Sequence, residues 1–337
     1  MAVEGKSIGL ALSGGGFRAT LFGLGSLWRL NEAGLLGKLD TITSVSGGSI
    51  LAGVLAQRWA ELAFVDGRAS NFGAVVADRV RAFCNRTIDV GSGLKGIINP
   101  LKSAGEYLAD SYDKYLFQGM ALSAIPAAKT PGSPTFVFYA TSLQTGRSFR
   151  FRQDLIADWK LGTSRSTAVR LAQAVAASSA FPPLFSPVVI ETDPSSWTGG
   201  EVHARLNAMR KRLVLSDGGV YDNMGLEVLQ QGKVDFALVS DAGAPFDLEV
   251  NPKTGPLQMA RVRDILIDQT RALRKRMLIG DLATRRQRGA YWGIETAIND
   301  YKDGRALVRD NPTTAALARV PTRLAGFEPR IQAQLIN

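Results

Sequence analysis

Three short motifs place residues that could carry chemistry at junctions between predicted strands and predicted helices. The first is SGGGFR at residues 13–18, directly after the apolar segment 8–12. Its glycines let backbone N–H groups turn toward a ligand beside a helix N-terminus, where the helix dipole favours negative charge. Such a turn can cradle the phosphate of a nucleotide or form the oxyanion hole of an acyl-transfer enzyme. The glycines alone do not decide between these functions and a plain strand–helix turn.

The second motif is TSVSGGS at residues 43–49, where a β-branched strand is predicted to lead straight into a helix. A nucleophile elbow requires small residues two positions before and two positions after its serine. Ser44 and Gly48 meet this condition around Ser46, and the following helix would direct its N-terminus at Ser46. The alternative is a helix-capping serine without a catalytic role.

The third motif is LVLSDGG at residues 213–219, in which Asp217 ends an apolar strand and two glycines follow. An aspartate in this position can serve as a general base, or it can simply begin a turn. Asp222 and Asp241 are competing carboxylates nearby in the sequence.

The chain contains a single histidine, His203, and a single cysteine, Cys84, among its 337 residues. One cysteine excludes an intramolecular disulfide and any cysteine-rich metal site. His203 lies in the polar stretch 195–205, for which we expect a surface loop rather than a catalytic position. A serine nucleophile needs a base within hydrogen-bond reach, so a carboxylate is the expected base. No cofactor or metal is expected, although a carboxylate site for magnesium or calcium remains open.

The motifs occur in the order that patatin-like phospholipases show, and the sequence resembles that family. The resemblance extends to AVAASSAFPPLF at 174–185 and DGGVYDN at 217–223, so that it spans Ile8 to Gly225. It implies a three-layer α/β/α fold with a mostly parallel central sheet, and acyl hydrolysis of lipids.

Carried over by position, the resemblance makes Ser46 the nucleophile and Asp217 its general base. It makes the glycine turn the oxyanion hole, with a basic residue after it, which here means Gly14, Gly15, Gly16 and Arg18. Ser44 and Ala19 stand where the family often has glycine, and neither change removes a reacting group.

Hydrophobic periodicity predicts the elements that must position these residues, in one α/β domain covering 1–337. Strands are expected at 7–13, 41–45, 135–141, 148–151, 187–190, 212–216 and 236–240. Helices are expected at 19–33, 47–62, 71–88, 166–177 and 258–282, with a further helix beginning near 331. We expect 90–134 to be an insertion or cap and 258–337 to be a C-terminal helical part.

The formal net charge is +10, and basic residues are concentrated at 261–288. The apolar residues of that helix, including Leu266 and Leu273, are expected to face the core and leave a solvated cationic face. The alternative is attraction of this face to anionic lipid headgroups. The sequence shows no secretory signal and no run of about 18 apolar residues, which favours a cytoplasmic protein with peripheral membrane contact.

These observations predict a serine acyl hydrolase acting on membrane phospholipids or related lipid esters. An acyltransferase or a hydrolase of small esters or thioesters could use the same dyad, and an inactive membrane scaffold could retain the fold. The alternative from another class is a nucleotide-binding module or nucleotide-regulated effector, in which the glycine turn holds phosphate. The turn lacks the Lys-Ser/Thr pair of a P-loop, and no nucleic-acid partner is expected. A homo-oligomer and activation by a small molecule remain open.

Overall fold

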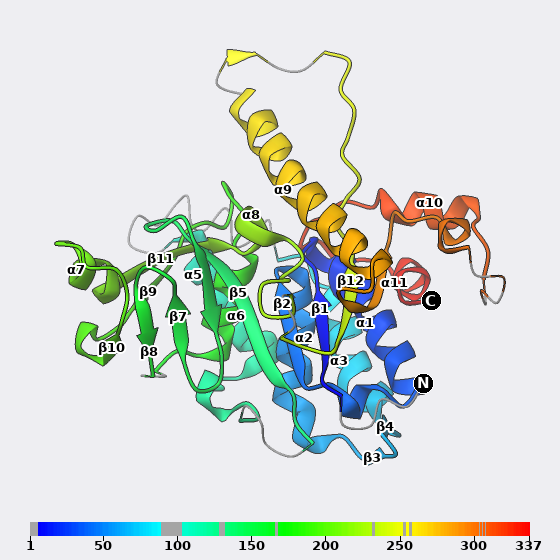
Figure 1. Ribbon diagram of the computed structural model, residues 1–337, viewed down its shortest axis with the longest axis horizontal. Helices are drawn as coiled ribbons and strands as arrows, with labels where there is room; N and C mark the ends of the chain where they lie inside the picture. The colour runs from blue at the N-terminus through cyan, green and yellow to red at the C-terminus, as the bar shows by residue number, and fades with distance from the viewer. Residues whose placement is uncertain are drawn as a thin grey trace.

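A large mixed β-sheet runs through the centre of the molecule (Figure 1). The computed structural model describes residues 6–88, 103–127, 132–165, 168–230, 233–251, 254–255, 258–302, 304, 306 and 308–337. The strands of the sheet are β1 (Ile8–Leu12), β2 (Thr41–Val45), β5 (Thr135–Ser142), β6 (Ser148–Phe151), β7 (Ile156–Asp158), β8 (Gly162–Ser164), β9 (Val188–Glu191), β10 (Trp197–Thr198), β11 (Arg212–Asp217), β12 (Phe236–Asp241) and β13 (Arg288–Gly293). In this part of the chain their order is β10-β8-β7-β6-β5-β2-β1-β12-β13, with β11 paired to β5 and β9 paired to β11.

The centre of the sheet is parallel. β5, β2, β1, β12 and β13 follow one another as parallel neighbours. The sequence of β1, IGLAL, is buried along its whole length, as expected for a parallel strand covered on both faces. The strands predicted at 41–45, 135–141 and 236–240 all lie here, which confirms the mostly parallel core.

Beyond β5 the sheet continues by antiparallel pairing through β6, β7, β8 and β10. The hairpin between β5 and β6 is the one predicted across Thr145 and Gly146, and it sets Phe138 opposite Phe151. β11 also pairs antiparallel with β5, and β9 pairs antiparallel with β11. This antiparallel part brings β11, with Asp217 at its end, back toward the parallel core.

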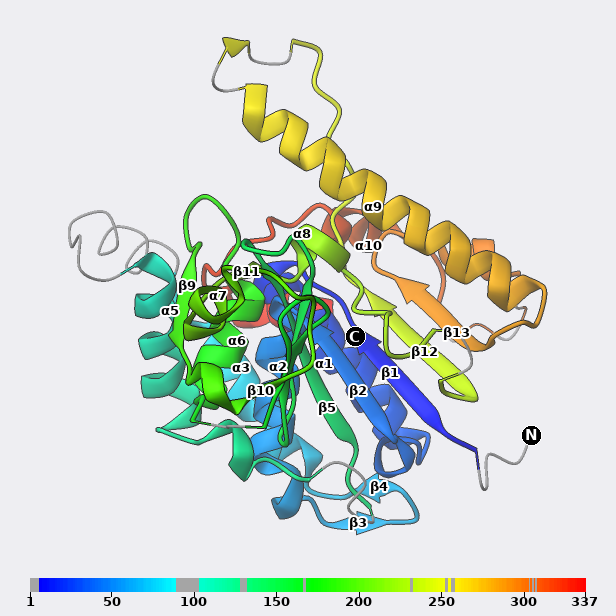
Figure 2. The ribbon, with the colours of Figure 1, turned by 60° about the vertical axis from the view of Figure 1, so that its left-hand side comes forward.

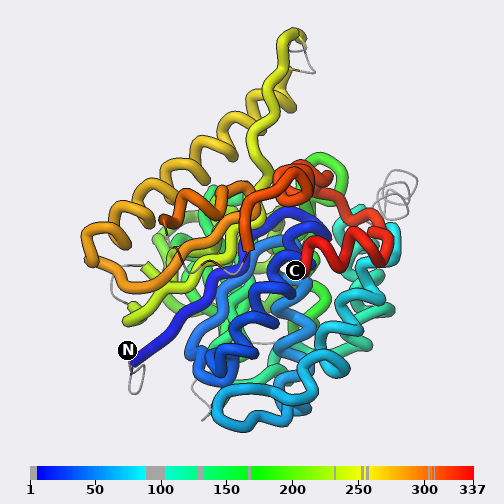
Figure 3. Tube along the Cα trace, turned by 90° about the vertical axis from the view of Figure 1, so that its right-hand side faces the viewer, coloured from blue at the N-terminus to red at the C-terminus, as the bar shows by residue number. Residues whose placement is uncertain are grey.

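Helices cover both faces of the sheet, which confirms the three-layer α/β/α architecture (Figure 2). The helices are α1 (Gly16–Glu32), α2 (Gly47–Arg58), α3 (Asp78–Cys84), α5 (Ala104–Tyr112), α6 (Leu171–Ser179), α7 (Leu206–Lys211), α8 (Gly219–Asp222), α9 (Gln258–Ala283), α10 (Pro312–Ala318) and α11 (Pro329–Ile336). The main core lies between the sheet and α1, α2, α3, α5 and α6. The opposite face carries α8 and α9 over a smaller core that includes Met224, Leu278 and Tyr291. α11 packs beside α1, so the C-terminal segment lies against the N-terminal helix (Figure 3).

Several predicted elements differ in detail from the observed ones. The helix expected at 71–88 consists of a π-helical turn at Gly73–Ala77 followed by α3. The region expected to be a C-terminal helical part, 258–337, also contributes the edge strand β13, which the sequence analysis missed. The described portion of the expected insertion or cap, 103–127, forms α5 and a second π-helical turn, and it packs against α6 in the core. Residues 89–102 and 128–131 of that region, and the start of the helix expected at 166, lie outside the described residues.

The helix expected at 258–282 is confirmed as α9, but the expected orientation of its faces was wrong. Leu266 and Leu273 are 61% and 52% exposed, instead of facing the core. Arg271, expected on a solvated face, is buried. Ion pairs between this face and the body of the protein explain the reversal, because they satisfy charges that the sequence suggested would face water.

Among the described residues, no helix combines the length and the apolar character needed to cross a bilayer.

Candidate active site

Ser46 and Asp217 meet because β2 and β11 end at the same place on their common neighbour, β5. β2 runs parallel to β5 and ends with Val45 opposite Tyr139. β11 runs antiparallel to β5 and ends with Asp217 opposite Ala140, the next residue along β5. The carboxyl ends of the two strands therefore face each other, which brings together two residues that are far apart in the sequence.

Ser46 has a strained backbone, as the predicted nucleophile elbow requires. Its φ is 51° and its ψ is −119°, in a region that residues with a side chain rarely adopt. The helix α2 begins at the next residue. Gly48 packs closely on the start of the glycine turn, so that a Cβ at Gly48 would lie 2.7 Å from the carbonyl oxygen of Ser13. The expectation that small residues surround Ser46 for steric reasons agrees with this geometry.

A hydrogen-bonded network of buried serine residues fixes the backbone at Ser46. The backbone N–H of Ser46 donates to the hydroxyl oxygen of Ser178 at 3.0 Å and to its carbonyl oxygen at 3.1 Å. The Ser178 hydroxyl bonds that of Ser49 at 2.8 Å, and the Ser49 hydroxyl donates to Ser44 at 2.9 Å. Ser44 thus occupies the usual glycine position as a buried member of this network. The sequence analysis did not assign a role to Ser178, although it quoted the block that contains it.

Asp217 is buried and only half satisfied. Its Oδ1 accepts a hydrogen bond from the N–H of Gly219 at 2.7 Å. Within the described residues, its Oδ2 is the only buried carboxylate oxygen without a hydrogen-bond partner. Burial raises the pKa of Asp217 to about 7, against the lowering effects of the Gly219 N–H and the neighbouring Ser46 hydroxyl. A carboxylate with this pKa can accept a proton near neutral pH.

The competing acid–base residues are occupied elsewhere. Asp241 is buried and accepts hydrogen bonds from Arg271, Tyr291 and the N–H of Gly243. Asp222 accepts from the N–H groups of Met224 and Leu226. His203 is exposed in its loop, as the sequence predicted, and does not line the pocket beside Ser46.

The glycine turn lies next to Ser46 and offers two backbone donors. The N–H of Gly14 donates to the carbonyl oxygen of Asn223 at 2.9 Å, which removes it from the expected oxyanion hole. Gly15 and Gly16 line the pocket, and no described residue accepts a hydrogen bond from either N–H. Their φ angles of 140° and 57° require glycine. Because α1 begins at Gly16, the helix dipole adds positive potential at these donors.

Arg18 does not belong to the oxyanion hole, contrary to the prediction. Its guanidinium is fully buried and does not line the pocket. It donates to the carbonyl oxygens of Ala318 at 2.8 Å, Val320 at 2.9 Å and Ala242 at 2.6 Å. Arg18 therefore fastens the glycine turn to two later segments of the chain.

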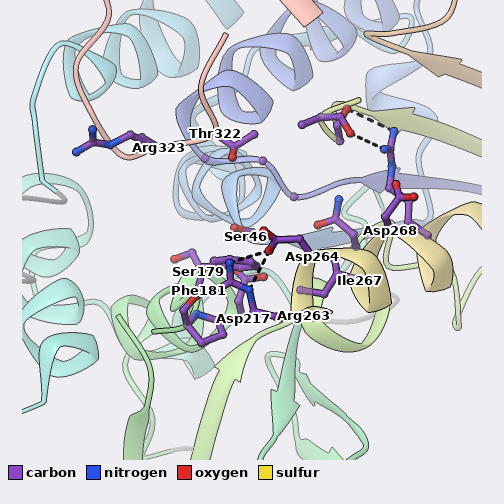
Figure 4. Close-up of a pocket in the computed structure, with 18 of the residues that line it drawn as sticks. Ser46, Ser179, Phe181, Asp217, Arg263, Asp264, Ile267, Asp268, Thr322 and Arg323 are labelled. Carbon is purple, nitrogen blue, oxygen red and sulfur yellow. Dashed lines mark hydrogen bonds and ion pairs between the residues drawn. The ribbon is translucent and has the colours of Figure 1, made fainter. Parts of the chain in front are cut away.

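The two residues and the turn open into a pocket of about 540 Å³ (Figure 4). One wall is the apolar segment 181–185, and a second is the inward face of α9, which contributes Ile267 and Asp268. A third wall is 322–324, where Thr322 and Arg323 lie on the opposite side of the site from α9 in Figure 4. The sequence analysis missed both later walls, because their position depends on tertiary packing.

The arginines of α9 at the pocket are engaged by groups of the protein. Arg271 pairs with Asp241 and Glu295, Arg263 pairs with Asp264, and Arg261 pairs with Glu249. In the described part of the chain, no group of three or more His, Cys, Asp or Glu side chains is placed to hold a metal ion. The arrangement thus offers a buried carboxylate, a strained serine and two backbone donors beside an apolar wall, a combination that can support acyl transfer.

A family model described as patatin-like phospholipase matches residues 10–229. The chain belongs to the patatin-like phospholipase family. The matched region contains the glycine turn, the elbow and Asp217, whereas the pocket walls formed by α9 and 322–324 lie outside it. A comparison with curated proteins finds no matching relative.

Two solved structures of a human phospholipase support the fold of this family member. Human GIVD cytosolic phospholipase A2 in complex with methyl gamma-linolenyl fluorophosphonate aligns with a TM-score of 0.51 and 15% identity, over 98% of this chain and 56% of that chain. A second complex, which also contains terbium chloride, gives a TM-score of 0.51 and 14% identity, over 98% and 56% of the two chains. VipD from Legionella pneumophila aligns with a TM-score of 0.39 and 16% identity, over 98% of this chain and 66% of that chain. The patatin-like chain thus spans a little over half of the human protein in these complexes.

Proposed function

We propose that this patatin-like protein hydrolyses fatty-acyl esters of phospholipids, with Ser46 as nucleophile and Asp217 as general base. The observation that carries the proposal is the unpartnered Oδ2 of buried Asp217 beside a serine in a strained elbow. A buried carboxylate oxygen without a donor costs free energy, so its retention needs a reason. A serine hydroxyl that transfers its proton to this oxygen supplies one.

The geometry supports a two-step reaction. In the first step the Ser46 Oγ attacks the ester carbonyl carbon while its proton moves to Oδ2 of Asp217. The N–H groups of Gly15 and Gly16 stabilise the oxyanion of the tetrahedral intermediate. The ester bond then breaks, and Asp217 returns the proton to the leaving alcohol of the lysolipid.

In the second step a water molecule enters beside the acyl-enzyme. Asp217 accepts a proton from the water as it attacks the acyl carbonyl carbon, and the same N–H groups hold the second oxyanion. The Ser46 oxygen leaves and takes back a proton from Asp217, which releases the fatty acid and restores the starting state. One carboxylate therefore acts as base and acid in both halves of the reaction.

The pocket supports a lipid acyl chain as substrate. Its volume of about 540 Å³ lies within the range of ligand sites that bury most of a small molecule. Phe181, Leu184 and Phe185 supply an apolar wall next to Ser46. An acyl chain against this wall would lose contact with water, which favours binding in proportion to the apolar area buried.

Covalent labelling with a fluorophosphonate tests the proposal directly, because the reagent phosphonylates an activated serine. We expect labelling of Ser46, identified by peptide mass spectrometry, and loss of labelling and ester hydrolysis in Ser46→Ala. Ser179→Ala is the matched control, since Ser179 lines the same pocket but its hydroxyl is bonded to Val175 and Tyr112. A folded Ser46→Ala protein that retains most of its hydrolysis, or label on Ser179, would contradict the dyad.

A further inference from the structure

α9 presents an unpartnered apolar stripe to solvent. Met259, Leu266, Leu273 and Met277 are each more than half exposed. They recur at intervals of three to seven residues, and Val262 lies among them, so they share one face of the helix. The opposite face contributes Ile267, Asp268 and Arg271 to the pocket. The stripe therefore lies on the outside of the pocket wall.

The stripe continues onto an arm that stands out from the body of the protein. Figures 1 to 3 show the N-terminal half of α9 and the segment before it projecting beyond the sheet and its helices. In that segment Leu248 and Val250 are 94% and 95% exposed. Arg261 ties the segment to the helix by contacts with Phe246 and Glu249. The arm is thus braced, although its apolar side chains have nothing to pack against among the described residues.

Positive charge accompanies the stripe. α9 carries six basic residues against three acidic ones, a net charge of +3, and five of the six form ion pairs with acidic side chains. Arg276 beside Met277, and Arg285 shortly after the helix, are exposed and form no ion pair with the described residues. An apolar stripe with basic residues along its edges is the composition of helices that lie in the headgroup region of anionic membranes.

We propose that the outer face of α9, together with Leu248 and Val250 of the preceding segment, docks the protein on an anionic lipid bilayer. Leu248, Leu266, Leu273 and Met277 would enter the headgroup–acyl boundary, with Arg276 placed at the phosphates. A second copy of the chain is the other occupant to consider, but it would bring a helix of the same positive charge against this face. The bilayer neutralises that charge. It would also lie within about one helix diameter, 10–12 Å, of the pocket wall.

Vesicle binding tests this docking without relying on the proposed function. The assay is co-sedimentation with vesicles of phosphatidylcholine and phosphatidylglycerol at 7:3, and with phosphatidylcholine alone. All proteins carry Ser46→Ala, so that the vesicles stay intact. We expect Leu266→Gln with Leu273→Gln to weaken binding to the anionic vesicles by at least about tenfold. Arg276→Gln should weaken it about fivefold.

The chain offers a closely matched control. Leu143 is 52% exposed, the same as Leu273, and lies in the turn after β5, outside α9 and the segment before it. Leu143→Gln should leave vesicle binding unchanged. Because Leu266 and Leu273 are exposed, the double variant should keep the thermal unfolding midpoint of its parent and, with Ser46 restored, its hydrolysis of a water-soluble short-chain ester.

A fluorescent label gives a second readout of the same contact. The only native cysteine, Cys84, is fully buried, so a thiol placed on the arm by Leu248→Cys can be labelled selectively. A polarity-sensitive dye there should shift to the blue on addition of anionic vesicles. No shift, or equal vesicle binding by the double variant and its parent, would overturn the proposal. So would a parent that is dimeric in light scattering and becomes monomeric in the double variant, with vesicle binding unchanged. Loss of short-ester hydrolysis in Ser46→Ala tests the proposed function separately.

Discussion

At the scale of single residues, Asp217 is a buried carboxylate whose environment suits the proposed role of a base. It lies at the end of β11 with one oxygen held by Gly219 and the other oxygen unpartnered. Because burial raises its pKa, ionising it destabilises the folded state. The contribution of protonated Asp217 to the free energy of unfolding is fully present below the pKa of an unfolded aspartate, and it is lost as the pH rises through about 7. The site thus holds a reactive carboxylate at a cost in folding free energy.

The pKa of Asp217 predicts the pH dependence of hydrolysis. If Asp217 must be ionised to accept the Ser46 proton, kcat/KM should rise about tenfold per pH unit below the midpoint and level off above about 7. His203→Ala should leave this profile in place, and it is an informative control because His203 is the only histidine of the chain. The measurement is kcat/KM on a soluble ester from pH 5 to 9. A midpoint that moves or vanishes in His203→Ala would assign the titration to the histidine.

At the scale of elements, the site is a meeting of two strand–helix junctions. β1 leads through the glycine turn into α1, and β2 leads through Ser46 into α2. The two helix N-termini lie side by side, because Gly47 packs against the backbone of Gly16 and Gly48 N–H donates to the Ser13 carbonyl oxygen. Both helix dipoles therefore favour negative charge at the point where the oxyanion would form.

A side chain at Gly15 should damage this junction selectively. Gly15 has a φ of 140°, and an added Cβ would lie 2.9 Å from the carbonyl oxygen of Ala242. We expect Gly15→Ala to lower kcat by about 10²–10³, with a smaller change in KM, because the donors act on the transition state. Gly146→Ala is the control, since Gly146 also has a positive φ but open space around it. An equal loss in both variants would reduce the effect to general backbone strain.

The sequence predicted the strand ends that place Ser46 and Asp217 better than it predicted β13 and the orientation of α9. Ser46 and Asp217 stand at ends of apolar strands with glycines after them, and the order of the motifs together with the resemblance to patatin-like phospholipases singled them out as site candidates. β13 was missed because its sequence, RGAYWG, lacks the alternation of a half-buried strand. The faces of α9 were assigned the wrong way round because its arginines find Asp241, Asp222 and Glu295, which only the tertiary fold brings near.

At the scale of the whole molecule, Arg18 links the family region to the segment that follows it. The carbonyl oxygens of Ala318 and Val320 accept hydrogen bonds from its guanidinium, and the carbonyl oxygen of Arg323 accepts from the N–H of Phe17. The segment 322–324 also forms a wall of the pocket. Arg18 was expected to act at the oxyanion hole because it follows the glycines, but its partners come from residues far along the chain, which spacing could not reveal.

Removing the Arg18 guanidinium should lower the stability of the fold and disturb the pocket wall formed by 322–324. Arg18→Met removes the guanidinium and leaves its three carbonyl acceptors without this donor, two of them buried and that of Val320 half-buried, at about 1–3 kcal/mol for each buried group. We expect a lower unfolding midpoint together with a fall in kcat on a soluble ester. Arg29→Met on the same helix is the control, because Arg29 is exposed and pairs only with Glu32. Unchanged hydrolysis in a destabilised Arg18→Met would restrict Arg18 to a structural role.

The hydrogen bond from Arg18 to the carbonyl oxygen of Val320 also bears on when the pocket can form during synthesis of the chain. The ribosome synthesises the glycine turn, Ser46 and Asp217 well before it synthesises the segment 322–324, which forms one wall of the pocket. While the chain is still being made, Arg18 lacks two of its three acceptors and the pocket lacks one wall. A nascent chain therefore contains Ser46 and Asp217 before it can complete the pocket around them. The order of synthesis delays the finished pocket until residues 318–324 have been made.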